Sequence, residues 1–188
     1  NLAYFLSKKY IMAASNYFGQ IVIGPAGCGK STYCQVLQSY GQEIKRNIRV
    51  VNLDPAAENF SYQCDLDIRD LISLDDVMEE LDYGPNGGLV YCMEYLLENL
   101  DWFQEEIDKF GDEDYILFDC PGQIELYSHL GLMKTLFKNL RQRGFSMCSV
   151  YLIDCTFLNE TSKFISGSFS ALASMISLEL PHLNVLTK

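Results

Sequence analysis

The clearest chemical signal in the sequence is a glycine-rich stretch, Gly24-Pro25-Ala26-Gly27-Cys28-Gly29-Lys30-Ser31. Its spacing fits the eight-residue P-loop pattern, in which glycines turn the backbone so that successive N–H groups face a phosphate. Lys30 would place a positive charge on the β- and γ-phosphates, and the Ser31 hydroxyl can bind Mg2+. An apolar run over 18–23 predicts a buried strand before the loop, and a helix follows over about 32–44. Strand, loop and helix together predict a nucleotide-binding loop rather than an ordinary glycine turn.

Two aspartates, Asp54 and Asp119, directly follow apolar runs that predict strands over 48–53 and 115–118. Ligands of open α/β sheets bind at the carboxyl ends of the strands, so Asp54 is a site candidate as well as a possible turn former. Asp119 opens an Asp-x-x-Gly motif that ends at Gly122. In P-loop proteins such an aspartate supports Mg2+ and the glycine N–H meets the γ-phosphate. The alternative is a helix start, where acidic residues are favoured by the helix dipole.

Gln123 and Glu125 extend this motif and are candidates to orient or deprotonate an attacking water. Another candidate is Asn86, in the stretch Gly84-Pro85-Asn86-Gly87-Gly88, which breaks the chain sharply. A phosphoryl transition state needs donors for its growing charge, and no arginine lies near a phosphate motif in the sequence. We therefore expect an exposed loop that presents Asn86 to the active site of a partner chain. The alternative is a turn between two helices, with Asn86 as a helix cap.

Strands and helices alternate along the chain, which predicts a doubly wound, mainly parallel sheet. The expected fold is α/β, a three-layer α/β/α P-loop NTPase domain over 17–188, preceded by an N-terminal extension over 1–16. Met12 is a candidate for the natural start. The remaining expected elements are a loop over 56–66, helices over 67–81, 89–110, 126–141 and 161–178, and strands over 149–153 and 183–186.

Composition narrows the possible partners and locations. The formal net charge is −11, which disfavours direct binding to nucleic acid because that function requires a basic face. No apolar run reaches the length of about 20 residues that a membrane span needs. The seven cysteines form no C-x-x-C pair, so a zinc site is not expected. Those in apolar runs are predicted to be reduced core residues, which favours an intracellular location: Cys34, Cys92, Cys148 and Cys155.

Four motifs resemble those of the GPN-loop GTPases: residues 24–31, 52–58, 84–88 and 119–127. The resemblance extends over about 17–188, and within the family it is strongest to one eukaryotic paralogue. It implies a GTPase that binds GTP and GDP with Mg2+, and a homodimer or a heterodimer with another GPN-loop paralogue. It also implies a role in RNA polymerase II assembly and nuclear import, with RNA polymerase II subunits as partners, and a cytoplasmic protein that shuttles to the nucleus.

Carried over by residue, the resemblance puts three residues on phosphates and Mg2+ and three around the hydrolytic water. The first set is Lys30, Ser31 and Thr32, and the second is Asp54, Gln123 and Glu125. It places Asp119 beside the metal and Asn86, with Gly84 and Pro85, in the loop that reaches the partner's active site. Thr187 and Lys188 begin the guanine-reading T-K-x-D motif, whose aspartate would lie beyond Lys188, so we expect a truncated chain. Related dimeric P-loop ATPases carry an early lysine where this chain has Pro25 and Ala26.

Two other functions remain open from the sequence. A P-loop kinase would use the same phosphate loop, but such kinases commonly close an arginine-bearing lid, and the five arginines here are not grouped in that way. A nucleotide-gated scaffold with vestigial hydrolysis would keep the binding motifs without fast turnover. Measured turnover separates the scaffold from the GTPase.

Overall fold

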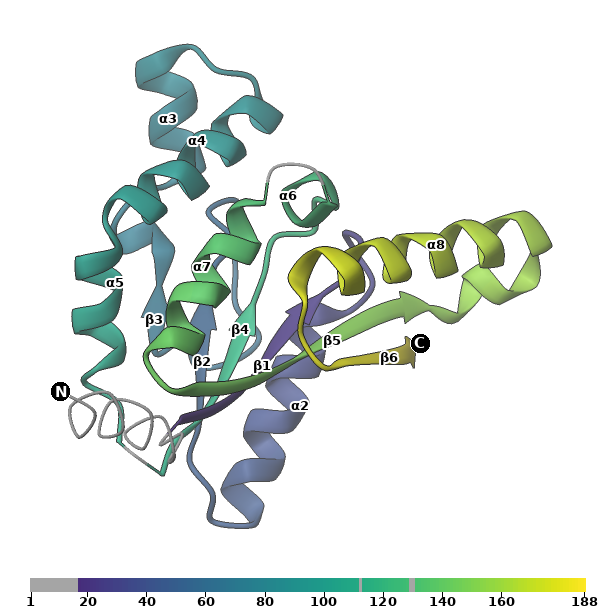
Figure 1. Cartoon of the computed structure of the whole chain (residues 1–188), viewed down its shortest axis with the longest axis horizontal. Helices are drawn as coiled ribbons and strands as arrows, with labels where there is room; N and C mark the ends of the chain where they lie inside the picture. Colours follow the sequence, from purple (N-terminus) through teal and green to yellow (C-terminus); the bar gives the residue numbers. More distant parts are fainter. Residues whose placement is uncertain (1–16, 112, 129–130) are drawn as a thin grey trace, which may run out of the picture.

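The computed structural model describes residues 17–111, 113–128 and 131–188, so the extension predicted over 1–16 lies outside the described residues. Within the described part, six parallel strands form one sheet in the order β3-β2-β4-β1-β5-β6 (Figure 1). The strands are β1 (Tyr17–Ile23), β2 (Ile48–Asn52), β3 (Leu66–Asp67), β4 (Tyr115–Asp119), β5 (Phe145–Asp154) and β6 (His182–Thr187).

The strand order brings three chain segments to one edge of the sheet. Asp119 at the end of β4 lies opposite Val22 of β1 on one side and opposite Asn52 of β2 on the other. The chain that follows β1, β2 and β4 therefore leaves the sheet at neighbouring points, as in other open α/β sheets. This is how residues far apart in the sequence reach one site.

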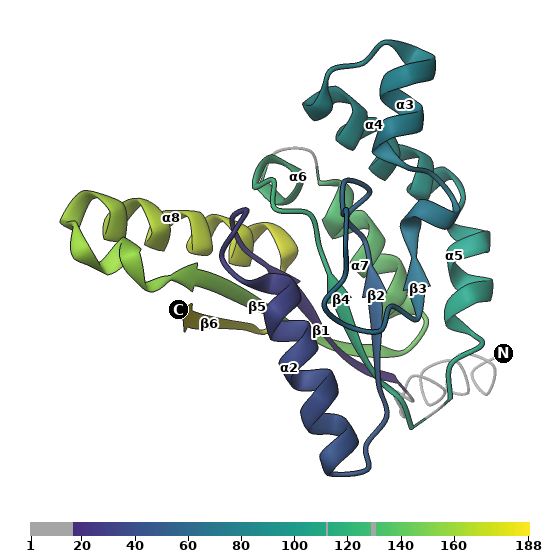
Figure 2. The same cartoon turned by 180° about the vertical axis from the view of Figure 1, so that it is seen from behind.

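Helices cover both faces of the sheet (Figure 2). On one face, α2 (Lys30–Glu43) packs on strand residues that include Val22, Val50 and Leu117. The other face carries the larger core, to which five further helices contribute: α4 (Pro85–Glu98), α5 (Leu100–Ile107), α6 (Glu125–Ser128), α7 (Leu132–Gln142) and α8 (Thr161–Leu178). Alternate residues of each strand thus face opposite layers. The predicted α/β class and doubly wound parallel sheet are confirmed.

Three of the predicted helices are interrupted in the structure. The helix predicted over 89–110 is wrong, because α4 already begins at Pro85 and the chain breaks at Asn99 before α5 starts. Pro85 fits the first helical position, where no backbone N–H is needed. Asn99 has a non-helical backbone, and its side-chain amide donates to Tyr95 O at 2.8 Å. A local side-chain bond of this kind competes with helix continuation.

The helices predicted over 67–81 and 126–141 are each divided as well. The first segment contains β3 and a 3-10 turn over Ile68–Asp70 before α3 (Leu74–Leu81) begins, because the Asp67 carboxylate accepts from Arg69 N and caps the turn. The second contains the short α6, and α7 then starts after Gly131, whose φ of 63° is left-handed. Periodicity alone did not reveal these breaks.

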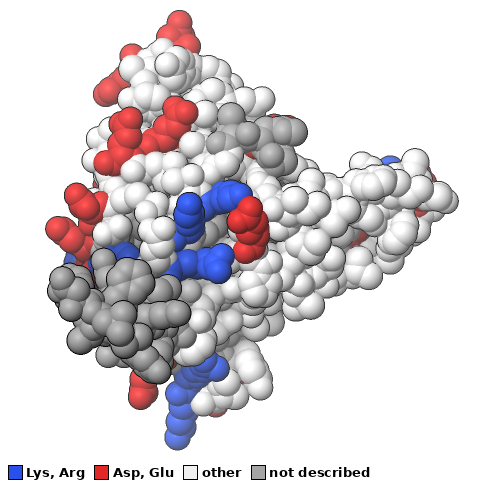
Figure 3. Space-filling model, in the orientation of Figure 1, with Lys and Arg blue, Asp and Glu red and all other residues white. Residues whose placement is uncertain are grey.

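Charge is unevenly spread over the surface. Figure 3 shows acidic side chains gathered over the α3–α5 side of the molecule, whereas the arm formed by α8 carries few charges on this face. Six large apolar side chains are exposed on α8: Phe164, Ile165, Phe169, Leu172, Met175 and Ile176. Among the helices of the described residues, none combines the length and the apolar character that crossing a membrane requires. All seven cysteines are free thiols; Cys34 and Cys92 are buried, and Cys148 and Cys155 are half-buried.

Candidate nucleotide-binding site

The loop between β1 and α2 has the backbone that its glycines predict. Gly24, Gly27 and Gly29 have φ values of 143°, 75° and 97°, a region that residues with a Cβ adopt only at a cost. Gly29 also forms the N-cap of α2. The Lys30 ammonium lies over the same loop, donating to Gly24 O at 3.2 Å and Pro25 O at 3.3 Å. The loop and the helix N-terminus thus form a compact anion-binding cradle.

The carboxylate of Asp119 lies beside the start of α2. Ser31 Oγ donates to Asp119 Oδ2 at 2.9 Å, and Tyr62 OH donates to the same oxygen at 3.0 Å. The other oxygen, Asp119 Oδ1, is buried and has no hydrogen-bond partner in the described part of the chain. Burial raises the pKa of Asp119, and the two donors only partly oppose that effect. An unpaired buried carboxylate oxygen beside a serine hydroxyl fits the ligand preferences of Mg2+.

Asp54 forms a turn and also lines the cavity, so the turn is confirmed and the role at the hydrolytic water stays a prediction. Its Oδ1 accepts from Ala56 N at 3.0 Å, and its own N–H donates to the Asn52 side chain at 3.0 Å. Burial raises the pKa of the Asp54 carboxyl, although the Ala56 N–H and the positive charges of Lys30 and Arg69 lower it. The Asp54 carboxylate thus stabilises the turn through Oδ1, and the residue also lines the cavity.

One cavity of about 450 Å³ joins these groups. Its lining combines the P-loop, the loop after β2 and the end of β4: Ala26, Gly27, Lys30, Ser31, Asn52, Asp54, Ala56, Ala57, Glu58, Asn59, Phe60, Asp119 and Gly122. Gly122 approaches the P-loop so closely that a Cβ added to it would lie 2.9 Å from Ala26 Cα. Thr32 lies exposed in the first turn of α2. The cavity is of the size and polarity that a small charged ligand needs.

Three of the four residues predicted to act in catalysis lie outside the lining of this cavity: Asn86, Gln123 and Glu125. Gln123 Nε2 donates to Asn86 Oδ1 at 2.7 Å within the same chain. The structure thus brings Asn86 together with a residue of the Asp119 motif of its own chain, and the expectation that Asn86 acts at a partner's active site stays a prediction. Asn86 also makes no helix cap, because Gly84 is the N-cap residue of α4 and α4 has no side-chain capping bond. Glu125 is exposed at the start of α6.

The last two residues of the chain lie against the P-loop. Thr187 Oγ1 donates to Cys28 O at 2.7 Å and to Ile153 O at 3.3 Å. Lys188 Nζ donates to Gly27 O at 2.5 Å and pairs with Asp154 Oδ2 at 3.2 Å. The segment predicted to read the base is thus held beside the segment predicted to bind the phosphates.

Sequence reasoning missed Arg69 and Tyr62. Arg69 Nη1 donates to Ala57 O at 2.7 Å, and its guanidinium lies 4.5 Å from the centre of the Phe60 ring. No arginine lies near a phosphate motif in the sequence, but the fold brings Arg69 against the loop after Asp54. The same guanidinium is bound to Asp67 at 2.6 Å, so Arg69 braces that loop. No local pattern in the sequence links these residues, although aromatic residues close to a strand-end aspartate were a signal that could have been weighed.

These features define an α/β P-loop protein with a nucleotide-sized cavity at the carboxyl ends of its strands. A family model described as "Conserved hypothetical ATP binding protein" matches residues 22–188. Proteins named GPN-loop GTPase 3 are similar over 90% of the chain, with 56% identity both for that of Dictyostelium discoideum and for that of Saccharomyces cerevisiae. The chain spans 59% and 62% of those two relatives.

A solved structure is similar as well, that of a GTPase from Pyrococcus abyssi in its apo form. It matches with a TM-score of 0.78 and 26% identity, over 93% of this chain and 68% of the archaeal chain. The chain belongs to the GPN-loop GTPase family. The resemblance seen in the four motifs is therefore confirmed, and the relatives carry the name of the third paralogue.

Proposed function

We propose that this protein binds GTP and GDP with Mg2+ and hydrolyses GTP. The observation that carries the proposal is the convergence of the P-loop, Asp54, Asp119 and Gly122 on one cavity. Lys30 and the loop N–H groups would hold the phosphates, and the Gly122 N–H lies where the P-loop and the Asp119 motif meet. The names of the relatives support GTP as the nucleotide.

Ser31 and Asp119 are the residues that would hold the metal. Groups of three or more His, Cys, Asp or Glu arranged to bind a metal are absent from the described residues. The pair of Ser31 and Asp119 suits Mg2+, which is usually bound by one or two protein groups together with substrate phosphates and water. When bound, Mg2+ neutralises charge that develops on the β- and γ-phosphate oxygens.

Gln123, Glu125 and Asp54 are proposed to act on the hydrolytic water. Asp54 lines the cavity, but Gln123 is bonded to Asn86 and lies outside the lining. Gln123 would have to change partner before it could orient a water at the γ-phosphate. That one observation also favours a second candidate function, a nucleotide-gated scaffold with little turnover. Glu125→Ala and Gln123→Ala should leave affinity near that of the wild type and slow turnover if hydrolysis is the function.

The proposed partners are a second copy of the chain or another GPN-loop paralogue. Two exposed features support a partner: Asn86 at the start of α4, and the apolar side chains on α8. Contiguous exposed apolar surface is typical of protein interaction sites. A role in RNA polymerase II assembly and nuclear import, with shuttling between cytoplasm and nucleus, is proposed from the family resemblance.

Titration calorimetry on the natural full-length protein tests the proposal, with GTP, GDP and ATP each added with and without Mg2+. We expect GTP to bind more tightly than ATP, because a carboxylate that pairs with guanine is left unsatisfied by adenine. Asp119→Asn should weaken the Mg2+ dependence of GTP binding more than that of GDP binding. Equal competition by GTP and ATP would contradict the guanine preference, and binding unaffected by Mg2+ would contradict the metal site.

A further inference from the structure

The Asp119 carboxylate receives a donor from a segment that no phosphate motif includes. Tyr62 lies in the loop between β2 and β3, is 57 residues away in the chain, and donates its hydroxyl to Asp119 Oδ2 at 3.0 Å. Only 7% of Tyr62 is exposed. With Ser31 bonded to the same oxygen, both donors gather on Oδ2, and the buried Oδ1 remains without a hydrogen-bond partner among the described residues.

The chain before Tyr62 is held by stacked side chains. The rings of Phe60 and Tyr62 are stacked at 5.2 Å, and the Arg69 guanidinium lies over the Phe60 ring. Arg69 is fixed in turn by Asp67 and by the carbonyl of Ala57. The position of the Tyr62 ring is thus determined by a column of packed planar groups.

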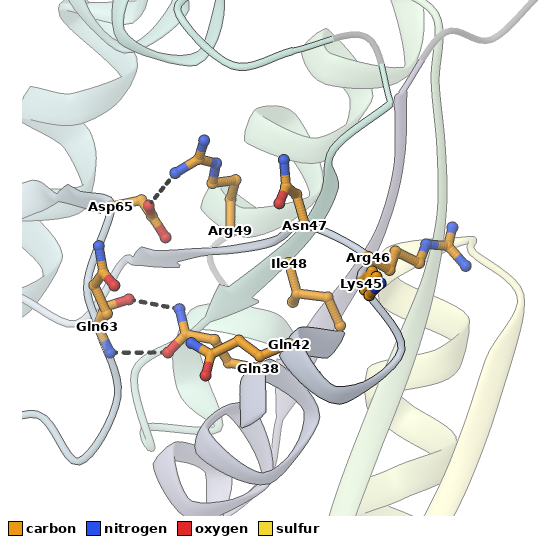
Figure 4. A pocket seen from close by; sticks show the side chains of 9 residues that line it. All are labelled: Gln38, Gln42, Lys45, Arg46, Asn47, Ile48, Arg49, Gln63 and Asp65. Atoms are coloured by element: carbon orange, nitrogen blue, oxygen red, sulfur yellow. Dashed lines mark hydrogen bonds and ion pairs between the residues drawn. The ribbon is translucent and has the colours of Figure 1, made fainter. Parts of the chain in front are cut away.

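The chain after Tyr62 is anchored to α2 and β2 (Figure 4). The Gln38 side chain donates to Gln63 O and accepts from Gln63 N, each at 2.9 Å. Asp65 accepts from Val50 N at 2.9 Å and pairs with Arg49 at 2.8 Å. Figure 4 shows these groups along the wall of a separate polar cavity of about 380 Å³. Anchored on both sides, Tyr62 can hold a carboxylate in one orientation without further ordering.

The Tyr62 hydroxyl is the donor in this bond, because a carboxylate oxygen has no proton to give. Ser31 alone would restrain the Asp119 carboxylate less well. Its hydroxyl would have to donate to Asp119 Oδ2 and offer a lone pair to the metal at the same time. With Tyr62 as a second donor from a rigid segment, the orientation of Asp119 no longer depends on Ser31 alone. Groups behind a metal site commonly orient its ligands in this way.

We propose that Tyr62 is a positioning residue for Asp119: by holding Oδ2, it leaves Oδ1 for the hydrated Mg2+ that accompanies the nucleotide. This inference rests on the proposed function. It also connects the loop that carries Asp54 to the metal site, because the same segment supplies both residues. A change at the metal would therefore be transmitted directly to the loop that lines the cavity.

The test is the Mg2+ concentration needed for half-maximal tightening of GTP binding, measured by calorimetry on the full-length protein. Tyr62→Phe keeps the ring and removes only the hydroxyl. We expect it to raise that Mg2+ concentration about tenfold, at the lower end of the effect of losing a group behind a metal site. GDP affinity without Mg2+ should stay within about twofold of the wild-type value, because Lys30 and the P-loop are unchanged.

Tyr33→Phe is the matched control. Tyr33 is half-buried beside the same sheet face, and its hydroxyl donates to Gln20 Oε1 at 2.8 Å, away from Asp119. It should lower thermal stability to a similar extent and leave the Mg2+ requirement unchanged. Tyr62→Met, which also lacks the hydroxyl, should reproduce the shift if Tyr62→Phe folds poorly.

Each outcome decides the proposal. A wild-type Mg2+ requirement in a folded Tyr62 variant would overturn the positioning role while leaving the proposed function intact. Equal shifts in the Tyr62 and Tyr33 variants would mean general loosening and would overturn it too. A wild-type protein that binds GTP without regard to Mg2+ would reject the proposed function itself, and the inference with it.

Discussion

Two glycine-containing segments, the P-loop and the Gly84–Gly88 stretch, each lead into a helix of 14 residues. In the P-loop, the glycines have positive φ values, and the loop lines a cavity through Ala26 and Gly27. In the second segment, Gly84 is extended and Gly87 and Gly88 are ordinary helical residues. The expected loop over Gly84–Gly88 is exposed at Asn86, but it is helical from Pro85 onward, because α4 already begins there.

The difference lies in what each glycine provides. A P-loop glycine supplies a conformation, since φ values of 75° and 97° at Gly27 and Gly29 would strain any side chain. Gly88, in contrast, allows α4 and α3 to pack closely. A Cβ at this position would lie 2.6 Å from Leu74 Cδ1 of α3. The same residue type thus marks a ligand cradle in one place and a helix contact in the other.

The largest expected effect is at the P-loop. Lys30→Ala should abolish measurable nucleotide binding, because no other ammonium takes the place of Lys30 among the residues that line the cavity. Titration calorimetry with GDP measures this. Lys109→Ala is a suitable control, since the exposed Lys109 follows α5 and pairs with Glu106 of that helix. Unchanged GDP affinity in Lys30→Ala would remove the basis for the P-loop assignment.

At the second segment we expect a loss of rate without a loss of binding. Asn86→Ala should keep folding and nucleotide affinity and lower GTP turnover about tenfold or more, the range for losing one positioned donor. Steady-state phosphate release measures this. An affinity loss with normal turnover would contradict the role.

Mixing Asn86→Ala with Lys30→Ala chains separates action on a partner from action within one chain. In a mixed dimer, the Asn86→Ala subunit keeps its P-loop and faces an intact Asn86 on the partner. Recovered turnover would indicate action across the dimer. The bond between Asn86 and Gln123 gives the opposite outcome a structural basis, namely an effect confined to one chain. No recovery, with mixed dimers confirmed by mass, would support that reading.

The smallest expected effect is a difference in the free energy of unfolding between alanine variants of Gly87 and Gly88. A Cβ at Gly87 would meet nothing within 4 Å, so Gly87→Ala should stabilise the protein by about 0.5–1 kcal/mol through helix propensity. Gly88→Ala gains the same propensity but must displace Leu74, and we expect it to be about 1 kcal/mol less stable than Gly87→Ala. Denaturant unfolding of both variants checks the difference. Equal stabilities would show that Leu74 yields without cost.

The sequence predicted the parts of the site that rest on local patterns. The P-loop is contiguous, and Asp54 and Asp119 follow recognisable strands whose ends a parallel sheet brings together. Tyr62 was missed because a tyrosine in a polar loop has no periodicity and its partner is 57 residues away. The bond between Gln123 and Asn86 was missed for the same reason: it depends on how α4 is placed against the chain after β4, which no spacing encodes.

The position of β1 also governs how the protein can be made. β1 is the first described strand to leave the ribosome, yet it pairs with β4, where Phe18 lies opposite Tyr115, and with β5, where Tyr17 lies opposite Phe145. Neither neighbour exists while the first hundred residues are being synthesised. Pairings so distant in the chain form slowly, and an unpaired apolar strand invites aggregation. The nascent chain therefore carries a complete P-loop sequence well before β4 and β5 can pair with β1 and form the nucleotide site.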